Sequence, residues 1–517
     1  MAEITEAETV PWYRNHSSSS PFKLYRKLSL PVASRSRQQT SPDQFRSLAA
    51  FPWTRDSSRN LWNDRQIILN DDEWQKMVDK YSDAILVGSN RRIYVFWLHS
   101  ARQPLFVNLP PHPEPSKRVV PTDKPHVNWV LSPDNPYSPY VVFSSRSLLY
   151  IYSFETDQVS VFRGHGGHIT SIAVHPILPH LFATTSRDFS TRIYDLTQKP
   201  KQSPNNLAWP PRTTPSFSGP AHGLDMNERE GVGIGRCVLV LMGGRAGGHN
   251  GDVLNAAFHK NYPMIATCGM DRTVKIWHIP VIIPDGRLMS EDKPLFTSSR
   301  IHAARVLSID WLSDEILISH NAPPLVPIPD TVNRNERQDD GEYEPLQYGV
   351  SEGKMIVWRW LGLDRFFPPG WDEYEVRQDV LRGTASDYQE SSSYTIISTV
   401  DLPLRKTQYE TPSLDVFCEQ GQDPLVLYTF PGSEEIRVLN IADFKPQKVP
   451  PCPWPQEEET ILDTLTLSED GELPGWNISI PREHNAHQER LDVCVMYRGG
   501  RTIVATSARS IWIWKAS

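Results

Sequence analysis

The sequence predicts an all-β fold, a seven-bladed β-propeller with long loop insertions. Short runs of alternating apolar and polar residues recur from about residue 44 to the end of the chain, and two of the segments built from them repeat one another closely. Such alternation is typical of half-buried strands, and self-similarity at about 40 residues is typical of propeller blades. The 45 prolines and 28 glycines fit many short strands separated by turns.

The individual strands follow from these alternating runs. Residues 84–88 and 92–98 read as two strands joined by a tight turn, and residues 140–144 and 148–152 repeat the pattern. Further strands are expected at residues 169–174, 181–185, 191–196, 253–258, 264–268, 273–278, 306–311, 315–318, 354–358, 425–430, 436–441, 491–496, 502–506 and 510–514. No segment reads as an amphipathic helix of comparable strength.

Seven blades can be counted along the chain. They are expected to start near Phe45, His126, His168, Asp252, Arg305, Thr399 and Arg490. The last blade has too few residues for four strands, so a strand near residues 22–28 would have to close the ring and remove the exposed sheet edges. We therefore expect a flexible arm over residues 1–40 that holds this strand, and the propeller over residues 41–517.

Long insertions interrupt the strands at residues 198–235, 322–350, 367–393 and 448–489. Structureless loops of this length are uncommon inside a compact domain. A propeller accommodates them because its blade connections project from the two faces of the ring, away from the core.

The internal repeat carries the most informative chemistry. One copy starts at Gly164-His165 and reaches a tight-turn Asp188; the other starts at Gly248-His249 and reaches Asp271. This is the WD40 signature, in which each repeat is one four-stranded blade. His165, Asp188, His249 and Asp271 are therefore expected to form buried structural networks.

A catalytic Ser-His-Asp triad would use the same residue types. One triad suffices for catalysis, whereas two copies at equivalent blade positions favour an architectural role. No catalytic residue, metal ligand or cofactor site is predicted, and the glycines of residues 231–235 precede a strand rather than follow one, unlike a phosphate-binding loop.

Net charge and cysteine usage narrow the classes of protein and partner that fit this sequence. The net charge of −8 argues against a general nucleic-acid binder and leaves room for a local basic patch, and no direct sequence-specific nucleic-acid partner is expected. Five scattered cysteines without a CxxC pair predict neither disulfides nor zinc, and favour a reducing compartment. No signal peptide or membrane-spanning stretch is apparent, so an intracellular chain with no membrane partner is expected.

Several segments together resemble one WD40 family, EED (extra sex combs), the propeller subunit of Polycomb repressive complex 2. The resemblance lies in residues 87–91, 164–176, 247–271, 301–312 and 510–514, with Cys268-Gly269-Met270-Asp271 and the Ser-Ile-Trp-Ile-Trp ending as its most specific parts. The long insertions depart from animal members and are similar to a fungal-type variant.

The resemblance implies a nuclear, non-catalytic scaffold. Its expected partners are an enhancer-of-zeste-like methyltransferase subunit, gripped on one face, and a methylated histone H3 tail on the other. The alternative is a generic WD40 adaptor, such as a ubiquitin-ligase substrate receptor or a histone chaperone. An enzyme built on a propeller would need convergent acid, base or metal-binding residues at the central channel, and the sequence shows no such set.

The family reads trimethyl-lysine with an aromatic cage, which attracts the ammonium through cation–π contacts. The positions that align with the cage hold Ser47, Pro125, residues 413–415 and Leu491. The candidates for a displaced cage at the channel mouth are Phe45, His126, Tyr409 and Arg490. An imidazole offers little π surface, so weak or absent methyl-lysine binding is expected.

Overall fold

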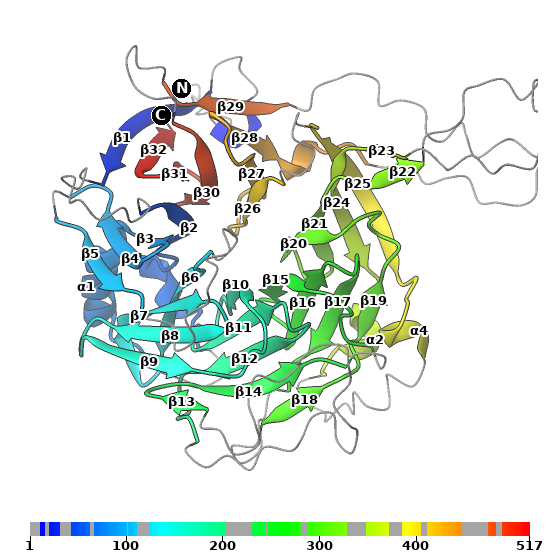
Figure 1. The fold of residues 1–517 in the computed structure, drawn as a ribbon, viewed down its shortest axis with the longest axis horizontal. Helices are drawn as coiled ribbons and strands as arrows, with labels where there is room; N and C mark the ends of the chain where they lie inside the picture. Colours follow the sequence, from blue (N-terminus) through cyan, green and yellow to red (C-terminus); the bar gives the residue numbers. More distant parts are fainter. Residues whose placement is uncertain are drawn as a thin grey trace, which may run out of the picture.

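The structure is a computed structural model. It describes residues 11–15, 20–30, 43–62, 67–100, 102–110, 124–201, 230–243, 247–280, 288–327, 348–371, 385–404, 411–446, 474–481 and 489–516. Within these residues, seven sheets of four or five strands stand around a central axis, as Figure 1 shows. The predicted fold, a seven-bladed β-propeller, is confirmed.

Each blade runs from an inner strand at the axis to an outer strand at the rim. Blades one to four consist of β2 (Phe45–Ala50), β3 (Ala84–Ser89), β4 (Arg92–Trp97) and β5 (Leu105–Asn108); β6 (Val127–Ser132), β7 (Asn135–Ser145), β8 (Leu148–Ser153) and β9 (Gln158–Phe162); β10 (Ile169–Val174), β11 (Leu181–Ser186), β12 (Thr191–Asp195) and β14 (Arg236–Leu241); and β15 (Val253–Phe258), β16 (Met264–Gly269), β17 (Val274–His278) and β19 (Phe296–Ser298). Blades five to seven consist of β20 (Val306–Trp311), β21 (Ile316–Asn321), β24 (Gly353–Trp360) and β25 (Tyr394–Leu402); β26 (Ser413–Phe417), β27 (Leu425–Thr429), β28 (Glu435–Asn440) and β29 (Gly475–Ser479); and β30 (Leu491–Tyr497), β31 (Thr502–Ser507), β32 (Ser510–Ala516) and β1 (Phe22–Ser29).

A few further elements decorate the ring. They are β13 (Gly231–Val232) on blade two, β18 (Met289–Glu291) on blade three, the hairpin of β22 (Leu325–Pro327) and β23 (Tyr348–Val350), and the helices η1 (Trp12–Arg14), η2 (Arg55–Arg59), α1 (Asp71–Tyr81), α2 (Leu363–Phe366), α4 (Ala385–Tyr388) and η6 (Ile441–Asp443). No helix among the described residues is long and apolar enough to cross a membrane.

The N-terminal strand completes the last blade. β1 pairs antiparallel with β32, with Phe22 opposite Ala516 and Ser29 opposite Ser510. The two ends of the chain thus share one sheet, and the ring has no open edge at this point. The rest of the arm predicted over residues 1–40 lies mostly outside the described residues, and its flexibility stays a prediction.

The apolar core is divided among the blade interfaces. Seven clusters of buried apolar residues are present in the described structure, and each one joins two neighbouring blades. One example is the cluster of Phe45 and Ile85 from blade one with Val504 and Ile511 from blade seven. Every sheet is therefore covered on both faces.

One predicted blade boundary is wrong. The sixth blade was expected to start near Thr399, but residues 394–402 form β25, which pairs with β24 as the outer strand of the fifth blade. The sixth blade begins with β26 at Ser413. Two insertions within blade five delay its outer strand, so the spacing of repeats misassigns that strand. The other six inner strands begin within one residue of the predicted positions.

The prediction that no segment forms an amphipathic helix is also wrong. α1 buries Trp74, Met77, Val78 and Tyr81, which follow the i, i+3, i+4, i+7 spacing of one helix face. Asn70 caps the helix by accepting hydrogen bonds from two backbone amides of the first turn. The helical spacing of these apolar residues is present in the sequence. It is easily missed, because it occurs in only one connection of a chain in which strand patterns dominate.

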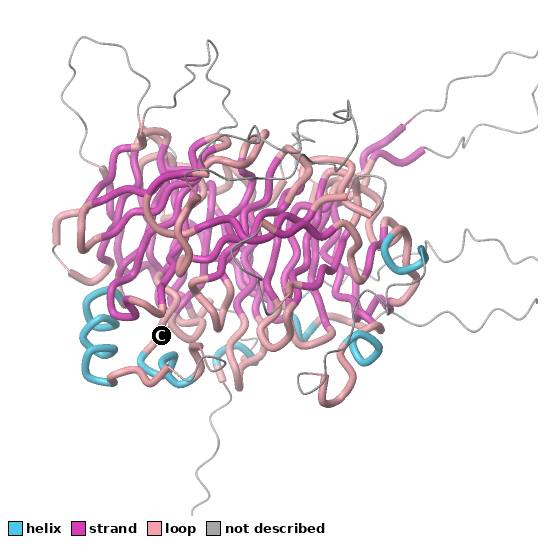
Figure 2. Tube along the Cα trace, turned by 90° about the horizontal axis from the view of Figure 1, so that it is seen from below, coloured by secondary structure: helices cyan, strands magenta, loops and turns pink. Residues whose placement is uncertain are grey.

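The ring has two faces. We call upper the face where the inner strands begin and lower the face where they end, as in Figure 2. The connection that holds α1 crosses the lower face: the Trp62 amide donates to the Ile177 carbonyl (3.1 Å), and Trp62 Nε1 donates to His180 Nδ1 (2.9 Å). This connection from blade one therefore covers the lower face as far as blade three.

Five inner strands share an irregularity near the upper face. The register with the second strand shifts after the first residue, which leaves one unpaired residue in each of these strands. The unpaired residues are Arg46, Thr170, Leu254, Leu307 and Asp492. Such bulges bend the strand and re-aim side chains, here at the upper mouth of the central channel.

Candidate functional site

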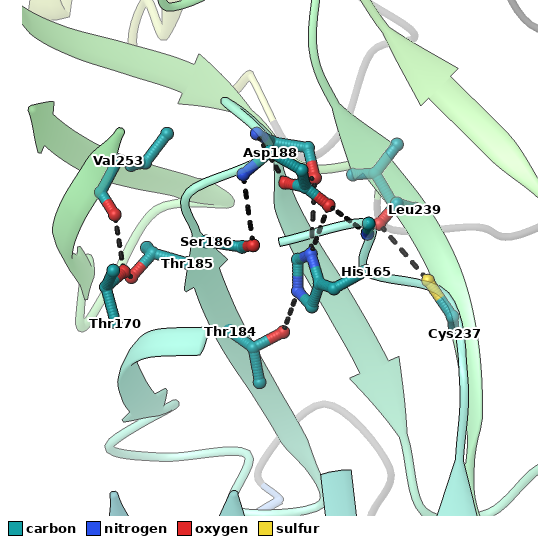
Figure 3. A network of polar contacts seen from close by, with 11 residues as sticks. His165, Thr170, Thr184, Thr185, Ser186, Asp188, Cys237, Leu239 and Val253 are labelled. Atoms are coloured by element: carbon teal, nitrogen blue, oxygen red, sulfur yellow. Dashed lines mark hydrogen bonds and ion pairs between the residues drawn. The ribbon is translucent and has the colours of Figure 1, made fainter. Parts of the chain in front are cut away.

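The predicted residues of the third blade form one hydrogen-bonded network, shown in Figure 3. His165 Nδ1 lies 2.9 Å from Asp188 Oδ2, and His165 Nε2 lies 2.7 Å from Thr184 Oγ1. Asp188 also accepts from the Gly166 amide (2.9 Å) and from the Ser190 hydroxyl (2.6 Å). All of these side chains are buried, so the network ties the turn between β11 and β12 to the connection that leads into β10.

The fourth blade repeats the network and adds one member. His249 Nδ1 lies 3.0 Å from Asp271 Oδ2, and His249 Nε2 lies 2.8 Å from Thr267 Oγ1. Trp277 Nε1 donates to the same Thr267 hydroxyl (2.9 Å). The indole thus donates to the hydroxyl, the hydroxyl to the imidazole and the imidazole to the carboxylate, so each of these buried polar groups has a partner.

A third network in blade five was missed. His302 Nδ1 lies 3.0 Å from Asn321 Oδ1, His302 Nε2 lies 2.7 Å from Ser319 Oγ, and Trp358 Nε1 donates to Ser319 Oγ (3.0 Å). Only the histidine was visible as a repeat signal, because asparagine replaces the aspartate and a long insertion separates it from the indole.

In the last blade, a glutamate is the acceptor for the buried serine and tryptophan side chains. Glu489 accepts from the Ser507 hydroxyl (2.8 Å) and from Trp512 Nε1 (3.2 Å), and it pairs with Lys27 (3.0 Å). The carboxylate thus accepts from the serine and the indole, where an imidazole contacts the equivalent hydroxyl in blades three to five. Lys27 lies on β1, so this network also anchors the ring-closing strand.

The electrostatics of the paired groups fit a structural role. Burial favours a higher pKa for Asp188, but the charge and hydrogen bonds of His165, Arg192 and Ser190 outweigh it and lower the pKa to about 2. Burial lowers the pKa of His165 below its ordinary value. At neutral pH the pair is a carboxylate and a neutral imidazole, and its burial keeps it away from any substrate.

A channel of about 1240 Å³ runs along the axis. It is lined by inner-strand residues, among them Ser47, Asn128, Ser171, Asn255 and Asp415. Aromatic residues lie toward its lower end, where Phe51, Trp53, Phe417 and Tyr497 contribute to the wall.

The candidate cage residues do not converge in the described structure. Phe45 is fully buried and packs edge-on against Tyr94 and Phe96 in the interface between blades seven and one. Its ring is a core residue and cannot face a ligand in the channel, which corrects the prediction that placed it in the cage. The bulge that follows Phe45 leaves Arg46 unpaired, and Arg46 and Ser47 line the channel instead of Phe45.

The other three candidate cage residues do not lie together either, as far as the structure describes them. His126 lines the channel, and burial followed by the charge of Lys124 lowers its pKa to about 4, so the ring is neutral. Arg490 is exposed and lies beside Gly432. Tyr409 lies outside the described residues.

Polar residues of the inner strands connect neighbouring blades around the channel. Asn128 Nδ2 donates to the Ile172 carbonyl (3.3 Å), which joins blades two and three. Asn255 Oδ1 accepts from the Ile309 amide (3.4 Å), and Asp415 Oδ2 accepts from the Met496 amide (2.9 Å). These bridges were not predicted, because each depends on the distance between strands of different blades.

Two carboxyl groups of the inner strands, of which Asp415 lines the channel, have raised pKa values. Burial raises the pKa of Asp310 to about 6. Burial, with a smaller contribution from Asp310, raises the pKa of Asp415 to about 7 although the Met496 amide opposes the shift. Among the residues that the structure describes, no group of three His, Cys, Asp or Glu side chains could hold a metal ion.

The first expected outcome concerns the buried network. Asp188→Ala should lower the free energy of unfolding by about 1–3 kcal/mol, because it leaves His165 and the Gly166 amide without their acceptor. Asp188→Asn should cost less than half of that, since blade five uses Asn321 in the same position. Denaturant unfolding measures both, and equal losses for the two variants would contradict this account.

The second expected outcome is a pH dependence. The pKa of Asp415 is above its unfolded value of about 3.9, so the folded chain holds a proton that the unfolded chain releases. Stability from this group is complete below about pH 4 and is lost as the pH rises through about 7. Asp415→Asn should therefore raise the melting temperature more at pH 8 than at pH 5.

Asp188→Asn is the matched control for this measurement. The pKa of Asp188 is about 2, so its contribution is lost only as the pH falls through that value, and the variant should shift stability equally at pH 5 and pH 8. A shift for Asp415→Asn that is the same at both pH values would contradict the channel-side titration.

The WD40 family (WD domain, G-beta repeat) matches residues 156–195 and 235–278, which are the parts that hold the networks of blades three and four. The Polycomb group protein FIE2 of Zea mays is 29% identical over 139 residues, covering 26% of this chain and 27% of the maize protein. The Polycomb protein EED of Chaetomium thermophilum is 27% identical over 157 residues, covering 30% of this chain and 21% of that protein.

The chain is also similar to a protein whose name indicates a process other than Polycomb repression. A probable cytosolic Fe-S cluster assembly factor of Schizosaccharomyces pombe is 30% identical over 131 residues, covering 23% of this chain and 21% of that protein. The matched segment thus spans less than a third of the length of each of these relatives.

A solved structure extends the likeness to the whole ring. A chain in the crystal structure of the Chaetomium thermophilum Polycomb repressive complex 2 has a TM-score of 0.56 and 14% identity, covering 96% of this chain and 98% of that chain. At this identity the likeness establishes the fold. The chain is thus a seven-bladed β-propeller with two segments that match the WD40 repeat, and its predicted resemblance to the EED family is confirmed by its similarity to Polycomb proteins that include EED of Chaetomium thermophilum.

Proposed function

We propose that this chain is a nuclear, non-catalytic scaffold subunit of a Polycomb-type histone H3 lysine methyltransferase complex. The observation that carries the proposal is the joint likeness of the blade-three and blade-four segments to Polycomb proteins and of the whole ring to a chain of a Polycomb complex. Its partner would be an enhancer-of-zeste-like methyltransferase subunit.

The absence of a catalytic role is supported by burial. The histidine, threonine and carboxylate groups that could resemble a nucleophilic triad are enclosed between blades, and Thr184 and Thr267 have no exposed surface. Asp310 and Asp415 belong to different inner strands, and each accepts a hydrogen bond from a backbone amide of its own or a neighbouring strand. Each of these carboxyl groups thus serves as an acceptor for a backbone amide of the inner strands.

The lower face is the surface that we assign to the methyltransferase subunit. Phe417 lines the channel there and is partly exposed, and the lower-face connection from blade one, with α1, stands beside it. Aromatic side chains are enriched at the energetic centres of protein interfaces. A helix of the partner could bury its apolar side against this surface.

The complex should depend on this chain. An enhancer-of-zeste-like subunit should methylate histone H3 when this chain is present. Its methyltransferase activity should fall to background when this chain is absent, and this chain alone should be inactive. Phe417→Ala should weaken the binding free energy between the two subunits by at least about 1 kcal/mol, as expected for an interface anchor, and so reduce the amount that co-purifies. Arg490→Ala, on the upper face, is the matched control. Equal methylation with and without the chain would refute the scaffold role.

Methyl-lysine reading is expected to be weak or absent. The channel-facing positions that align with the family's cage are Ser47 and residues 413–415, none of which is aromatic, and Phe45 is enclosed in the core. Calorimetric titration should show no more than about a twofold preference for a trimethylated over an unmethylated H3 peptide, far below the value that a desolvated cation–π cage gives. A preference above tenfold would show that a cage forms.

The second candidate is a generic WD40 adaptor. It is favoured by the similarity to an Fe-S cluster assembly factor, whose name indicates a different process from that of the Polycomb relatives. Purification of the chain from its native cells, followed by mass spectrometry, separates the two: methyltransferase subunits support the first function, and assembly-factor or ubiquitin-ligase subunits support the second.

A further inference from the structure

Arginines occupy the upper-face turns of five blades. The turn between the second and third strands carries Arg509 in blade seven, Arg91 in blade one, Arg146 in blade two, Arg187 in blade three and Arg272 in blade four. These blades are consecutive around the ring, as Figure 1 shows. We call these five residues the arginine crescent.

The register of the blades places the whole crescent on the upper face. In each of these blades the second strand ends where the inner strand begins: Phe45 pairs with Ser89, Ile169 with Ser186, and the other three blades follow the same arrangement. The turn that follows the second strand therefore stands at the upper rim. Arg91, Arg187 and Arg272 are exposed there.

Two further cations lie inside the crescent, at the channel mouth. Arg46 is the unpaired residue of the first inner strand, and Lys124 precedes the second inner strand; both line the channel. Blades five and six interrupt the pattern, the former with its long insertion and the latter with Glu434 in the equivalent turn.

The carboxylates of the same turns and strands do not offset this charge fully. Asp188 and Asp271 keep their negative charge beside neutral imidazoles, but they lie inside the histidine networks, behind the exposed Arg187 and Arg272. Asp252 Oδ2 lies 3.8 Å from Arg187 Nε. Asp492 interacts electrostatically with Arg46 and Lys124. In a chain with a net charge of −8, this face thus gathers guanidinium groups along an arc.

We propose that the arginine crescent binds the phosphate backbone of a nucleic acid without reading its base sequence. Guanidinium groups suit phosphate because they donate in a fixed planar fork. An arc over five blades is too long for one acidic side chain and fits a ligand with regularly repeated negative charge. The turns present no strand or helix that could enter a groove, so base readout is not expected. The proposal is independent of the proposed scaffold function.

The test is the salt dependence of binding between the full chain and a fluorescent DNA duplex of about 30 base pairs, followed by anisotropy between about 50 and 200 mM salt. The triple variant Arg91→Gln, Arg187→Gln, Arg272→Gln should weaken binding and reduce the slope of log K against log salt by about 3, roughly one for each lost phosphate contact. Two duplexes of unrelated sequence should bind with the same affinity.

The matched control removes the same charge from the lower face. Arg55→Gln, Arg59→Gln, Arg359→Gln replaces three exposed arginines there and should leave the slope unchanged. Thermal unfolding checks that both triple variants remain folded. The proposal is overturned if the crescent variant keeps the wild-type slope, if both triple variants lose it equally, if the wild-type chain does not bind at the lowest salt, or if an acidic peptide of matched charge competes as well as the duplex.

Discussion

Burial of both faces of every blade is the constraint on which the rest of the structure depends. Seven apolar clusters lie between neighbouring blades of the described structure, and the one between blades seven and one joins the first sheet to the sheet that β1 completes by pairing with β32. An open ring would leave two sheet faces and a strand edge in water. Closure therefore fixes the channel, the two faces and the position of every turn.

The buried polar networks show what that constraint demands at the upper face. Blades three and four use histidine with aspartate, blade five uses histidine with asparagine, and blade seven uses Glu489 alone. What is preserved is the satisfaction of buried donors and acceptors, not the identity of the residues. Each solution ties a turn to the connection that enters the blade, and so each one positions exposed residues such as Arg187 and Arg272.

The two faces consequently have different characters. The lower face is crossed by the connection that holds α1 and has aromatic residues at the channel end, which suits an apolar helical partner. The upper face gathers guanidinium groups around a mouth where the described positions that line the channel and align with the family's cage, Ser47 and residues 413–415, carry no aromatic side chain. A scaffold with these faces would hold a protein on one side and meet an anionic partner on the other.

The sequence by itself determined the fold class, the two repeat networks and the family resemblance, because these depend on local strand periodicity and on motifs within one blade. It also contained the pattern of α1 and the histidine of the blade-five network. Only the tertiary structure decided that residues 394–402 belong to blade five, that Phe45 is enclosed by blade seven, and that Asn255 and Asp415 bridge neighbouring strands. Those outcomes depend on contacts between residues far apart in the chain, and ring closure, rather than local spacing, brings them together.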